Sequence, residues 1–391
     1  MSKTNKTLAI IVVAQFCCTS VWFAGNAVID DLIRDFNLLP TALGHLTSSI
    51  QLGFITGTLI FAILSIADRF SPSKVFFISA VFAAFFNLLL IFSANTFGSL
   101  MAFRFLAGFC LAGIYPVGMK IAADYFDKGL GKSLGYLVGA LVLGTAFPHL
   151  LSAINADFSW NYLIYATSLL SLTGGALIIL FVPDGPFRKA SQVLKLNAIF
   201  SIFKPQSFKL AAFGYFGHMW ELYTFWAFAP LLIVAHHDYH HHELGHIAFL
   251  SFMIIGSGAL GCVLAGYLAN RFSPQKTAFT ALAISASCCL LLPLVFMIGS
   301  PYLFVGFLVI WGISVVADSP LFSTMVAQNA IPELKGSALT IVNSIGFAIT
   351  ILSIQLLNIL YLNFEIQYIF VVLAIGPIAG LVYNRRERKQ M

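Results

Sequence analysis

Two ionisable residues stand close together inside a long apolar segment, and they are the first candidates for chemistry. Glu221 follows His218 by three positions in the run GHMWELY at 217–223. On a helix, positions i and i+3 lie on one face, where a carboxylate and an imidazole can share a proton. An ionised group in apolar surroundings is costly unless it is paired. We therefore expect His218 and Glu221 to exchange a proton or contact a polar ligand, with a structural hydrogen bond as the alternative.

Three more ionisable residues lie in apolar segments: Arg104, His149 and Asp318. Asp318 stands two residues before Pro320, and a proline frees a backbone carbonyl and breaks a helix. An acid beside such a break is a candidate proton or cation site, or a cap for the kink. His149 lies near the end of its segment, where a structural role is favoured.

A histidine-rich stretch between two apolar segments is the main locally biased composition in the chain. Imidazoles four residues apart on a helix can bind zinc, copper or nickel. A solvated loop without metal is the simpler interpretation, so these positions are weak metal candidates: His236, His237, His240, His241, His242 and His246.

The composition indicates which elements position these residues. Hydrophobic residues make up 59% of the chain and charged residues only 9%, whereas a soluble domain carries roughly 25% charged residues. Most of the surface must therefore face lipid. Twelve apolar runs approach the roughly 20 residues that cross a bilayer as a helix. These predicted spans are 8–29, 43–66, 75–94, 97–119, 134–154, 162–182, 210–234, 244–269, 277–298, 303–326, 339–360 and 366–383.

The distribution of cations predicts the orientation of these spans. With the N-terminus inside, all of the 21 Lys and Arg except Arg34, Arg104 and Lys120 fall in cytoplasmic segments. The positive-inside rule produces this asymmetry. We expect an integral protein of the plasma (inner) membrane with both termini in the cytoplasm. The basic balance is a topology signal, and no nucleic-acid surface is expected.

An internal repeat divides the chain into halves. The run ADRFSPSK at 67–74 recurs as ANRFSPQK at 269–276, each time between the second and third spans of its half. Self-similarity in matching positions indicates a tandem of two six-helix units. Because both copies face the same side, the repeats are parallel. The predicted organisation is a bundle at 1–183, a cytoplasmic linker at 184–209 and a second bundle at 210–391.

This arrangement resembles the major facilitator superfamily, whose loop signature runs Gly-x-Leu-Ala-Asp-Arg-x-Gly-Arg-Arg/Lys. The second copy matches its start with Gly266, Leu268, Ala269 and Arg271, but has Asn270 in place of the acid.

The first copy keeps Asp68 and Arg69 but has Leu64 for the leading glycine. The fourth span carries a second family signature, Arg-x-x-x-Gly, as Arg104 and Gly108. The resemblance implies an all-α integral membrane fold, with twelve helices in two pseudo-symmetric six-helix bundles.

The resemblance also implies where the site lies. Family members line a central cavity with their first, fourth, seventh and tenth spans, and their fourth-span arginine transfers protons or holds its helix. Four aromatic residues of the first and seventh spans can stack on an organic substrate or simply pack helices: Trp22, Trp220, Tyr223 and Trp226. The candidate substrate and proton-coupling residues are Trp22, Asn26, Arg104, Tyr115, His218, Glu221, Tyr223, Trp226 and Asp318.

The two octapeptides are predicted to form a cytoplasmic gate. In the family, an acid and an arginine of this loop latch neighbouring helices and part when the protein opens inward. Asn270 cannot supply that charge, so we expect a weaker latch in the second half. The gate candidates are Asp68, Arg69, Lys74, Asn270, Arg271 and Lys276.

The resemblance implies a secondary active transporter of a small organic solute that works by alternating access, with protons as the coupling ion. We expect no cofactor and no catalytic activity, because the sequence contains neither a phosphate-binding loop nor a His-Glu-x-x-His metal motif. We also expect a monomer. The fifth span lacks the Gly-Pro pair of drug:proton antiporters, which disfavours multidrug efflux. Two alternatives stay open: a transporter of transition metals or metal chelates that uses the histidines, and a receptor-like or regulatory membrane protein on this fold.

Overall fold

The computed structural model describes residues 3–125, 130–154, 159–188, 199–241, 245–331 and 334–388. Within these ranges the regular structure is helical and no strand occurs. The chain divides into two compact units, Met1–Leu194 and Lys195–Met391. This division falls inside the segment 184–209 that the sequence predicts as a linker.

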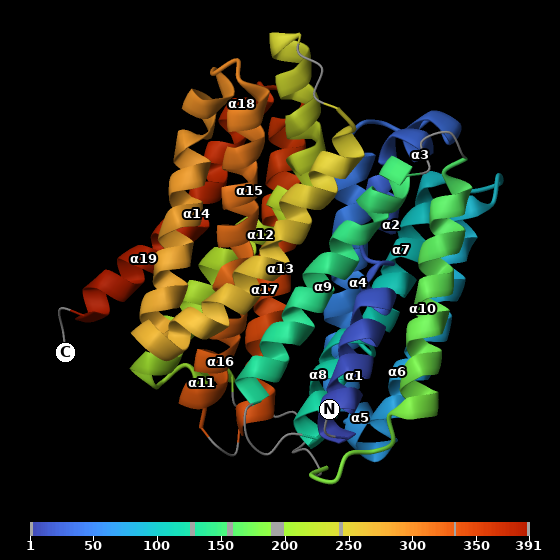
Figure 1. The fold of residues 1–391 in the computed structure, drawn as a ribbon, viewed down its shortest axis with the longest axis vertical. Coiled ribbons are helices and arrows are strands. Elements are labelled where there is room, and N and C mark those ends of the chain that lie inside the picture. The colour runs from blue at the N-terminus through green and yellow to red at the C-terminus, as the bar shows by residue number, and fades with distance from the viewer. Residues whose placement is uncertain are drawn as a thin grey trace. The chain divides into compact units, whose positions relative to one another are not determined.

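The first unit contains ten α-helices and one short 3-10 helix among its described residues, and its α-helices are labelled in Figure 1. In chain order they are α1 (Lys3–Thr19), α2 (Ala24–Ala27), α3 (Ile29–Asp35), α4 (Ala42–Ile63), α5 (Ile66–Arg69), α6 (Pro72–Leu88), η1 (Leu89–Ile91), α7 (Phe97–Leu111), α8 (Tyr115–Tyr125), α9 (Leu130–Ile154) and α10 (Asn161–Phe181).

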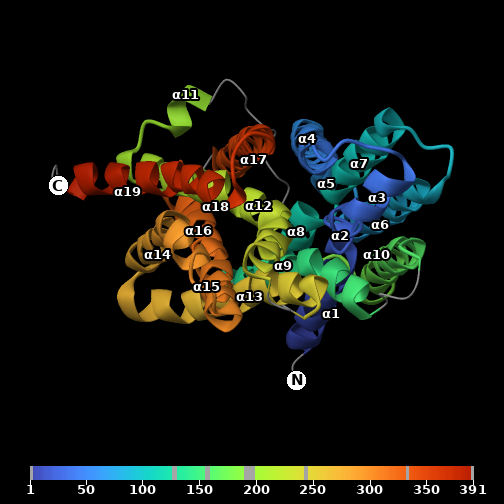
Figure 2. The same cartoon turned by 90° about the horizontal axis from the view of Figure 1, so that it is seen from above.

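The second unit repeats this plan with fewer interruptions; its helices are labelled in the view of Figure 2. Its described helices are α11 (Ile199–Ile202), α12 (Gln206–His240), α13 (Ile247–Phe272), α14 (Pro274–Phe296), α15 (Pro301–Ala317), α16 (Ser319–Asn329), α17 (Lys335–Leu360), α18 (Ile366–Ile369), η4 (Phe370–Ala374) and α19 (Ile375–Arg388).

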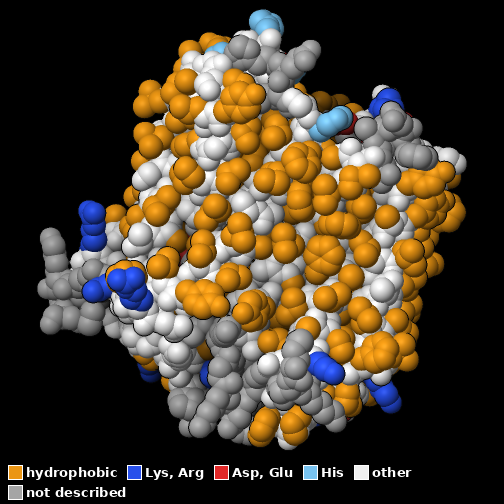
Figure 3. Space-filling model, in the orientation of Figure 1, with side chains coloured by type: hydrophobic (Ala, Val, Ile, Leu, Met, Phe, Trp, Pro, Cys, Tyr) orange, Lys and Arg blue, Asp and Glu red, His pale blue; other side chains and the backbone are white. Residues whose placement is uncertain are grey.

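Ten helical segments of the described chain are long and apolar enough to cross a membrane. Their outward side chains are largely hydrophobic, and hydrophobic side chains cover most of the face in Figure 3. The predicted spans 8–29 and 210–234 are not among the ten. The first is divided among α1, α2 and the start of α3, and α12 carries several polar and aromatic residues that lower its hydropathy.

Glycines allow the closest helix contacts in both units. A Cβ atom on Gly108 of α7 would lie 2.0 Å from the carbonyl oxygen of Ile50 on α4. A Cβ atom on Gly312 of α15 would lie 2.0 Å from the carbonyl oxygen of Ile254 on α13. Small residues let membrane helices approach backbone to backbone. The glycine of the Arg-x-x-x-Gly run and its counterpart in the second half thus serve the same packing.

Prolines restart a helix at matching places in the two units. Pro116 is the second residue of α8, just after α7 ends at Leu111, and Pro320 is the second residue of α16. A proline fits the first turn of a helix, where its missing N–H is not needed. The fourth and tenth predicted spans are consequently each built from two helices with a break between them.

Candidate functional site

A buried imidazole–carboxylate pair lies in the second unit. Nδ1 of His218, on α12, is 2.8 Å from Oδ1 of Asp318, and both side chains are at most 1% exposed. Among the described residues of the second unit, this is the only ion pair, and both of its side chains are buried. The structure thus brings together His218 of the seventh predicted span and Asp318 of the tenth.

The break in the tenth span positions Asp318. Asp318 lies between the last residue of α15 and the first residue of α16. Its backbone carbonyl accepts hydrogen bonds from the N–H groups of Leu321 and Phe322 at 3.0 and 2.9 Å. The chain turns here because Pro320 cannot continue the hydrogen-bonding pattern of α15. This turn directs the Asp318 carboxylate toward α12.

Each partner of the pair keeps a second polar atom without a hydrogen bond. Within the described chain, no donor or acceptor reaches Nε2 of His218 or Oδ2 of Asp318. Most buried polar side-chain atoms in proteins make at least one hydrogen bond, so these two atoms are exceptions. A polar ligand, water or an exchanging proton would satisfy them.

Glu221 lies one helical turn beyond His218 and is also fully buried. Its Oε1 accepts the indole N–H of Trp311 at 2.5 Å, and its Oε2 accepts the hydroxyl of Ser285 at 2.9 Å. The Cys289 thiol donates to Oε1 at 3.4 Å. The carboxylate therefore connects α12 to both α14 and α15, which is the structural hydrogen bonding that the sequence left as the alternative.

Arg104 occupies the interior of the first unit, where it is 1% exposed. Its Nη1 donates to the carbonyl of Val21 at 3.1 Å, and its Nη2 donates to the carbonyl of Trp22. These carbonyls belong to the gap between α1 and α2, and that of Val21 also accepts the backbone N–H of Ala24 at 3.4 Å. Arg104 holds this break in the first span, and no carboxylate of the described chain lies within ion-pair distance of it.

The aromatic and amide candidates are packed within their own units. Asn26 donates to the Thr47 hydroxyl at 2.8 Å, and the ring of Trp22 lies 4.8 Å from that of Phe54. The ring of Tyr223 is 5.3 Å from that of Trp226.

Tyr115 is the first residue of α8 and is partly exposed. His149 is buried, and its Nε2 has no hydrogen-bond partner among the residues described.

The first octapeptide forms an ion pair that the sequence did not identify. Nζ of Lys120 on α8 lies 2.9 Å from Oδ1 of Asp68 on α5, and 3.6 Å from Oδ1 of Asp124. Arg69, the other residue of the predicted latch, is exposed. The ion pair of Asp68 with Lys120 joins the loop to the end of the fourth predicted span.

The start of the predicted linker reinforces this latch. Nη2 of Arg188 donates to the backbone carbonyls of Asp68 and Phe70 at 2.8 Å each. The Ser71 hydroxyl donates to Asp184 at 2.6 Å, and Arg188 also pairs with Asp184 at 2.7 Å. The first octapeptide is thus held by charged groups from two other parts of its unit.

The second octapeptide has a different local structure. Helix α13 continues through Arg271 to Phe272, whereas the first copy breaks after α4 at Ser65, which has a φ of +50°. Asn270, Arg271 and Lys276 are exposed, as is Lys74 of the first copy. In the described residues, none of these four takes part in an ion pair of the kind that Asp68 makes.

The histidine-rich stretch mostly continues α12. Nε2 of His240 donates to the carbonyl of Phe296 at 2.8 Å, and the ring of His236 stacks on that of Phe304 at 3.9 Å. His242 lies outside the described residues. In the part of the chain that is described, no three His, Cys, Asp or Glu side chains are grouped closely enough to hold a metal ion.

Among the residues of these networks that sequence reasoning missed are Trp311, Ser285, Lys120 and Arg188. Trp311 and Ser285 are ordinary residues of apolar spans, and only the fold shows that they face Glu221. Lys120 carried a usable signal, because it stands at the end of a span, one turn from Asp124.

Comparisons with known proteins place this architecture in a family. The model of the Major Facilitator Superfamily matches residues 11–354. The bicyclomycin resistance protein homolog of Haemophilus influenzae is 21% identical over 370 residues, covering 90% of this chain and 89% of that protein. The niacin transporter NiaP of Acinetobacter baylyi is 31% identical over 134 residues, covering 31% of this chain and 29% of that protein.

Solved structures agree on the fold. The nucleoside transporter NupG superposes with a TM-score of 0.72 at 15% identity, covering 98% of this chain and 99% of that one. A bacterial homolog of the human lysosomal transporter Spinster, inward-facing and occupied, also gives 0.72, at 13% identity with 99% and 97% covered. At such low sequence identities, these superpositions show only that the fold is shared. Membership of the family rests on the match to the family model. The chain therefore belongs to the Major Facilitator Superfamily of membrane transporters.

Proposed function

We propose that this transporter moves a small organic solute by alternating access and that it couples this movement to a proton held between His218 and Asp318. The observation that carries the proposal is the 2.8 Å contact between two buried ionisable side chains, each with an unsatisfied polar atom. Relatives named for niacin, nucleosides and bicyclomycin support an organic solute.

The energetics of the pair favour a gated proton. With one proton shared, the two groups form either a neutral pair or an imidazolium–carboxylate pair, and both have no net charge. Removing the proton leaves an uncompensated negative charge in a low-dielectric interior, which is strongly unfavourable. The proton therefore leaves only when a rearrangement admits water or a polar solute to the pair. A proton whose release depends on conformation is the requirement for coupling.

Glu221 has a positioning role in this proposal. Its carboxylate is held by Trp311, Ser285 and Cys289, so it fixes the rotation of α12 and thereby the placement of His218 one turn away. A side chain with three donors has less freedom to exchange a proton than one with an unpaired oxygen. In this scheme, Asp318 rather than Glu221 gains and loses the proton.

The proposed topology has twelve crossings with both termini in the cytoplasm of the inner membrane. It adds α1 with α2, and α12, to the ten helices that satisfy length and composition. The polar residues that lower the hydropathy of α12 include His218 and Glu221 of the proposed site. Family members also place their first and seventh spans around the central cavity. We also propose that the protein transports its solute as a monomer, as the family resemblance implies.

The test begins with a thermal-shift screen of the purified protein against niacin, nucleosides, bicyclomycin and other small organic metabolites. The strongest binder is then radiolabelled and followed in proteoliposomes with an imposed pH gradient. We expect gradient-driven accumulation in the wild type and in Glu221→Gln, and only gradient-independent equilibration in Asp318→Asn. Accumulation that survives in Asp318→Asn would remove the pair from the coupling mechanism.

A further inference from the structure

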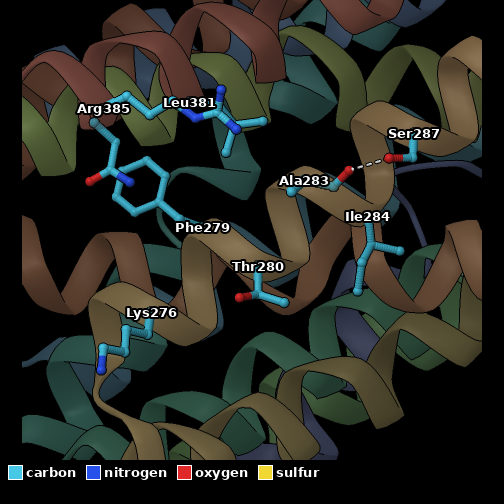
Figure 4. Close-up of a pocket in the computed structure, with 9 residues that line it drawn as sticks. Lys276, Phe279, Thr280, Ala283, Ile284, Ser287, Leu381 and Arg385 are labelled. Carbon is cyan, nitrogen blue, oxygen red and sulfur yellow. Dashed lines mark hydrogen bonds between the residues drawn. The ribbon is translucent and has the colours of Figure 1, made fainter.

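A groove on the second unit opens between α14 and α19. It has a volume of about 500 Å³, and α14 lines it with one continuous helical face. The labelled residues of Figure 4 show this face, from Lys276 at the first turn of α14 through Thr280 and Ile284. Leu381 and Arg385 on the neighbouring α19 complete the lining.

The polar and charged groups of the groove are unevenly distributed. Lys276 lies near the start of α14 and Arg385 near the end of α19, and both are exposed. Gln275 donates to Asn384 at 3.1 Å and so joins the two helices at this charged end. None of the nine described residues that line the groove is acidic. The charged end consequently presents two cations without a counter-ion from the lining.

Further along α14 the groove is apolar. Phe279, Ala283 and Ile284 contribute hydrocarbon, and Leu381 faces them from α19. The Ser287 hydroxyl donates to the carbonyl of Ala283 at 2.8 Å, so its hydrogen is used within its own helix (dashed line in Figure 4). The far end of the groove therefore offers no free donor from Ser287 to a polar ligand.

The length of the groove corresponds to one leaflet of a bilayer. Lys276 and Ser287 are separated by eleven residues on α14, which is about 16 Å at 1.5 Å per residue. Half of the hydrocarbon core of a membrane is about 15 Å thick. A ligand with an anionic head and an extended hydrocarbon tail of one leaflet's length matches this lining from end to end.

We infer that this groove binds an anionic phospholipid, with the phosphate at the end that carries Lys276 and Arg385 and an acyl chain along Ile284. Charge complementarity carries the choice of occupant, because a cation pair at the water boundary attracts anionic headgroups and basic clefts between membrane helices bind them. A zwitterionic lipid gains less from the same two cations. The inference is independent of the transported solute and of proton coupling.

The test is native mass spectrometry of the full-length protein in detergent. Phosphatidylglycerol and phosphatidylcholine with the same acyl chains are titrated separately, and the bound lipid is counted. We expect a site that prefers phosphatidylglycerol, and we expect the double variant Lys276→Gln with Arg385→Gln to weaken it about tenfold. The matched control is Lys335→Gln with Arg386→Gln, which removes two exposed cations of the same unit that do not line the groove.

Two further arms keep the inference testable if the double variant does not fold. Thr280→Trp fills the groove without altering charge and should abolish the preferred site, whereas Lys276→Arg should retain it. Water-soluble glycerol 1-phosphate should not displace the lipid, because it lacks the acyl chain. Equal binding of the two lipids, equal losses in groove and control variants, or displacement by glycerol 1-phosphate would each overturn the inference.

Discussion

The indole N–H of Trp311 on α15 donates to Oε1 of Glu221 on α12 at 2.5 Å, and both side chains are completely buried. Removing one partner of a buried hydrogen bond costs about 1–3 kcal/mol, because the other polar atom is left unsatisfied. This contact fixes the helix that carries His218 to the helix that ends at Asp318. The proposed proton pair consequently depends on a residue that touches neither member of it.

Removing the indole donor should lower stability. We expect Trp311→Phe to reduce the free energy of unfolding by about 1–3 kcal/mol, because a buried oxygen of Glu221 loses its donor. The measurement is the melting temperature in detergent. Trp220→Phe is the control, because its indole N–H makes a partly buried bond to the backbone carbonyl of Val372 at 3.1 Å, and its loss should cost less. An unchanged melting temperature in Trp311→Phe would mean that the other two donors hold Glu221 adequately alone.

The ion pair between Asp68 and Lys120 should influence transport more than insertion. Asp68→Asn and Lys120→Gln each remove the pair, and we expect both to cut the transport rate while the protein reaches the membrane at normal amounts. If the pair acts as a unit, the double variant is no slower than either single variant. Asn270→Ala is the matched control, because it changes the same position of the second octapeptide, where no ion pair is made in the described chain. Additive losses would indicate separate roles for the two residues.

The attachment of α3 to the start of α10 should weaken in acid. The indole N–H of Trp160 donates to Asp35 at 2.7 Å, and this bond, together with the nearby Arg34, lowers the pKa of the Asp35 carboxyl from its ordinary value of 3.8. A lowered pKa in the folded state gives a stabilising contribution that is present above the ordinary pKa and lost as the pH falls through the folded-state pKa.

We therefore expect the amide hydrogens of α3 to exchange faster, relative to those of α4, as the pH drops below about 4. Asp35→Asn should exchange at the faster rate throughout and show no such pH dependence. Hydrogen exchange measured over this pH range, corrected for the intrinsic rates, provides the check. A pH dependence that persists in Asp35→Asn would assign it to another group.

Glycine-mediated helix contact should tolerate no added carbon. We expect Gly108→Ala and Gly312→Ala each to destabilise the protein by about 1–3 kcal/mol, because the new methyl group would overlap a backbone carbonyl of the adjacent helix. Gly306→Ala, on α15, is the control and should be neutral, because no atom lies within 4 Å of the place that its methyl group would take in the described chain. The melting temperatures of the three variants test this prediction, and equal melting temperatures would contradict the packing argument.

The large features of the fold follow from periodic properties of the sequence. Apolar runs predict helices in lipid, and the repeated octapeptide predicts two related units. Pro320 predicts the break beside Asp318, since a proline acts through its own backbone wherever it stands. The break after Thr19 has no such signal, because the five residues Thr19 to Phe23 include neither glycine nor proline.

The partners of the candidate residues could not be predicted in the same way. His218 and Asp318 are one hundred residues apart, and only the packing of α12 against α15 and α16 brings them together. The sequence identified both as candidates because charge in an apolar span is rare. It named Asp68 and Arg69 as latch residues but not Lys120, the partner of Asp68, because a motif does not show which distant residue lies nearby in space.

The binding of Arg104 to the carbonyls of Val21 and Trp22 has an electrical consequence. A guanidinium stays protonated, and this one is compensated by backbone dipoles rather than by a carboxylate of the described chain. Any rearrangement that moves α7 along the membrane normal carries that elementary charge through the transmembrane field. A complete crossing is worth about 2.3 kcal/mol per 100 mV, so even a partial displacement makes the balance between conformations respond to membrane voltage, whether or not the transported solute is charged.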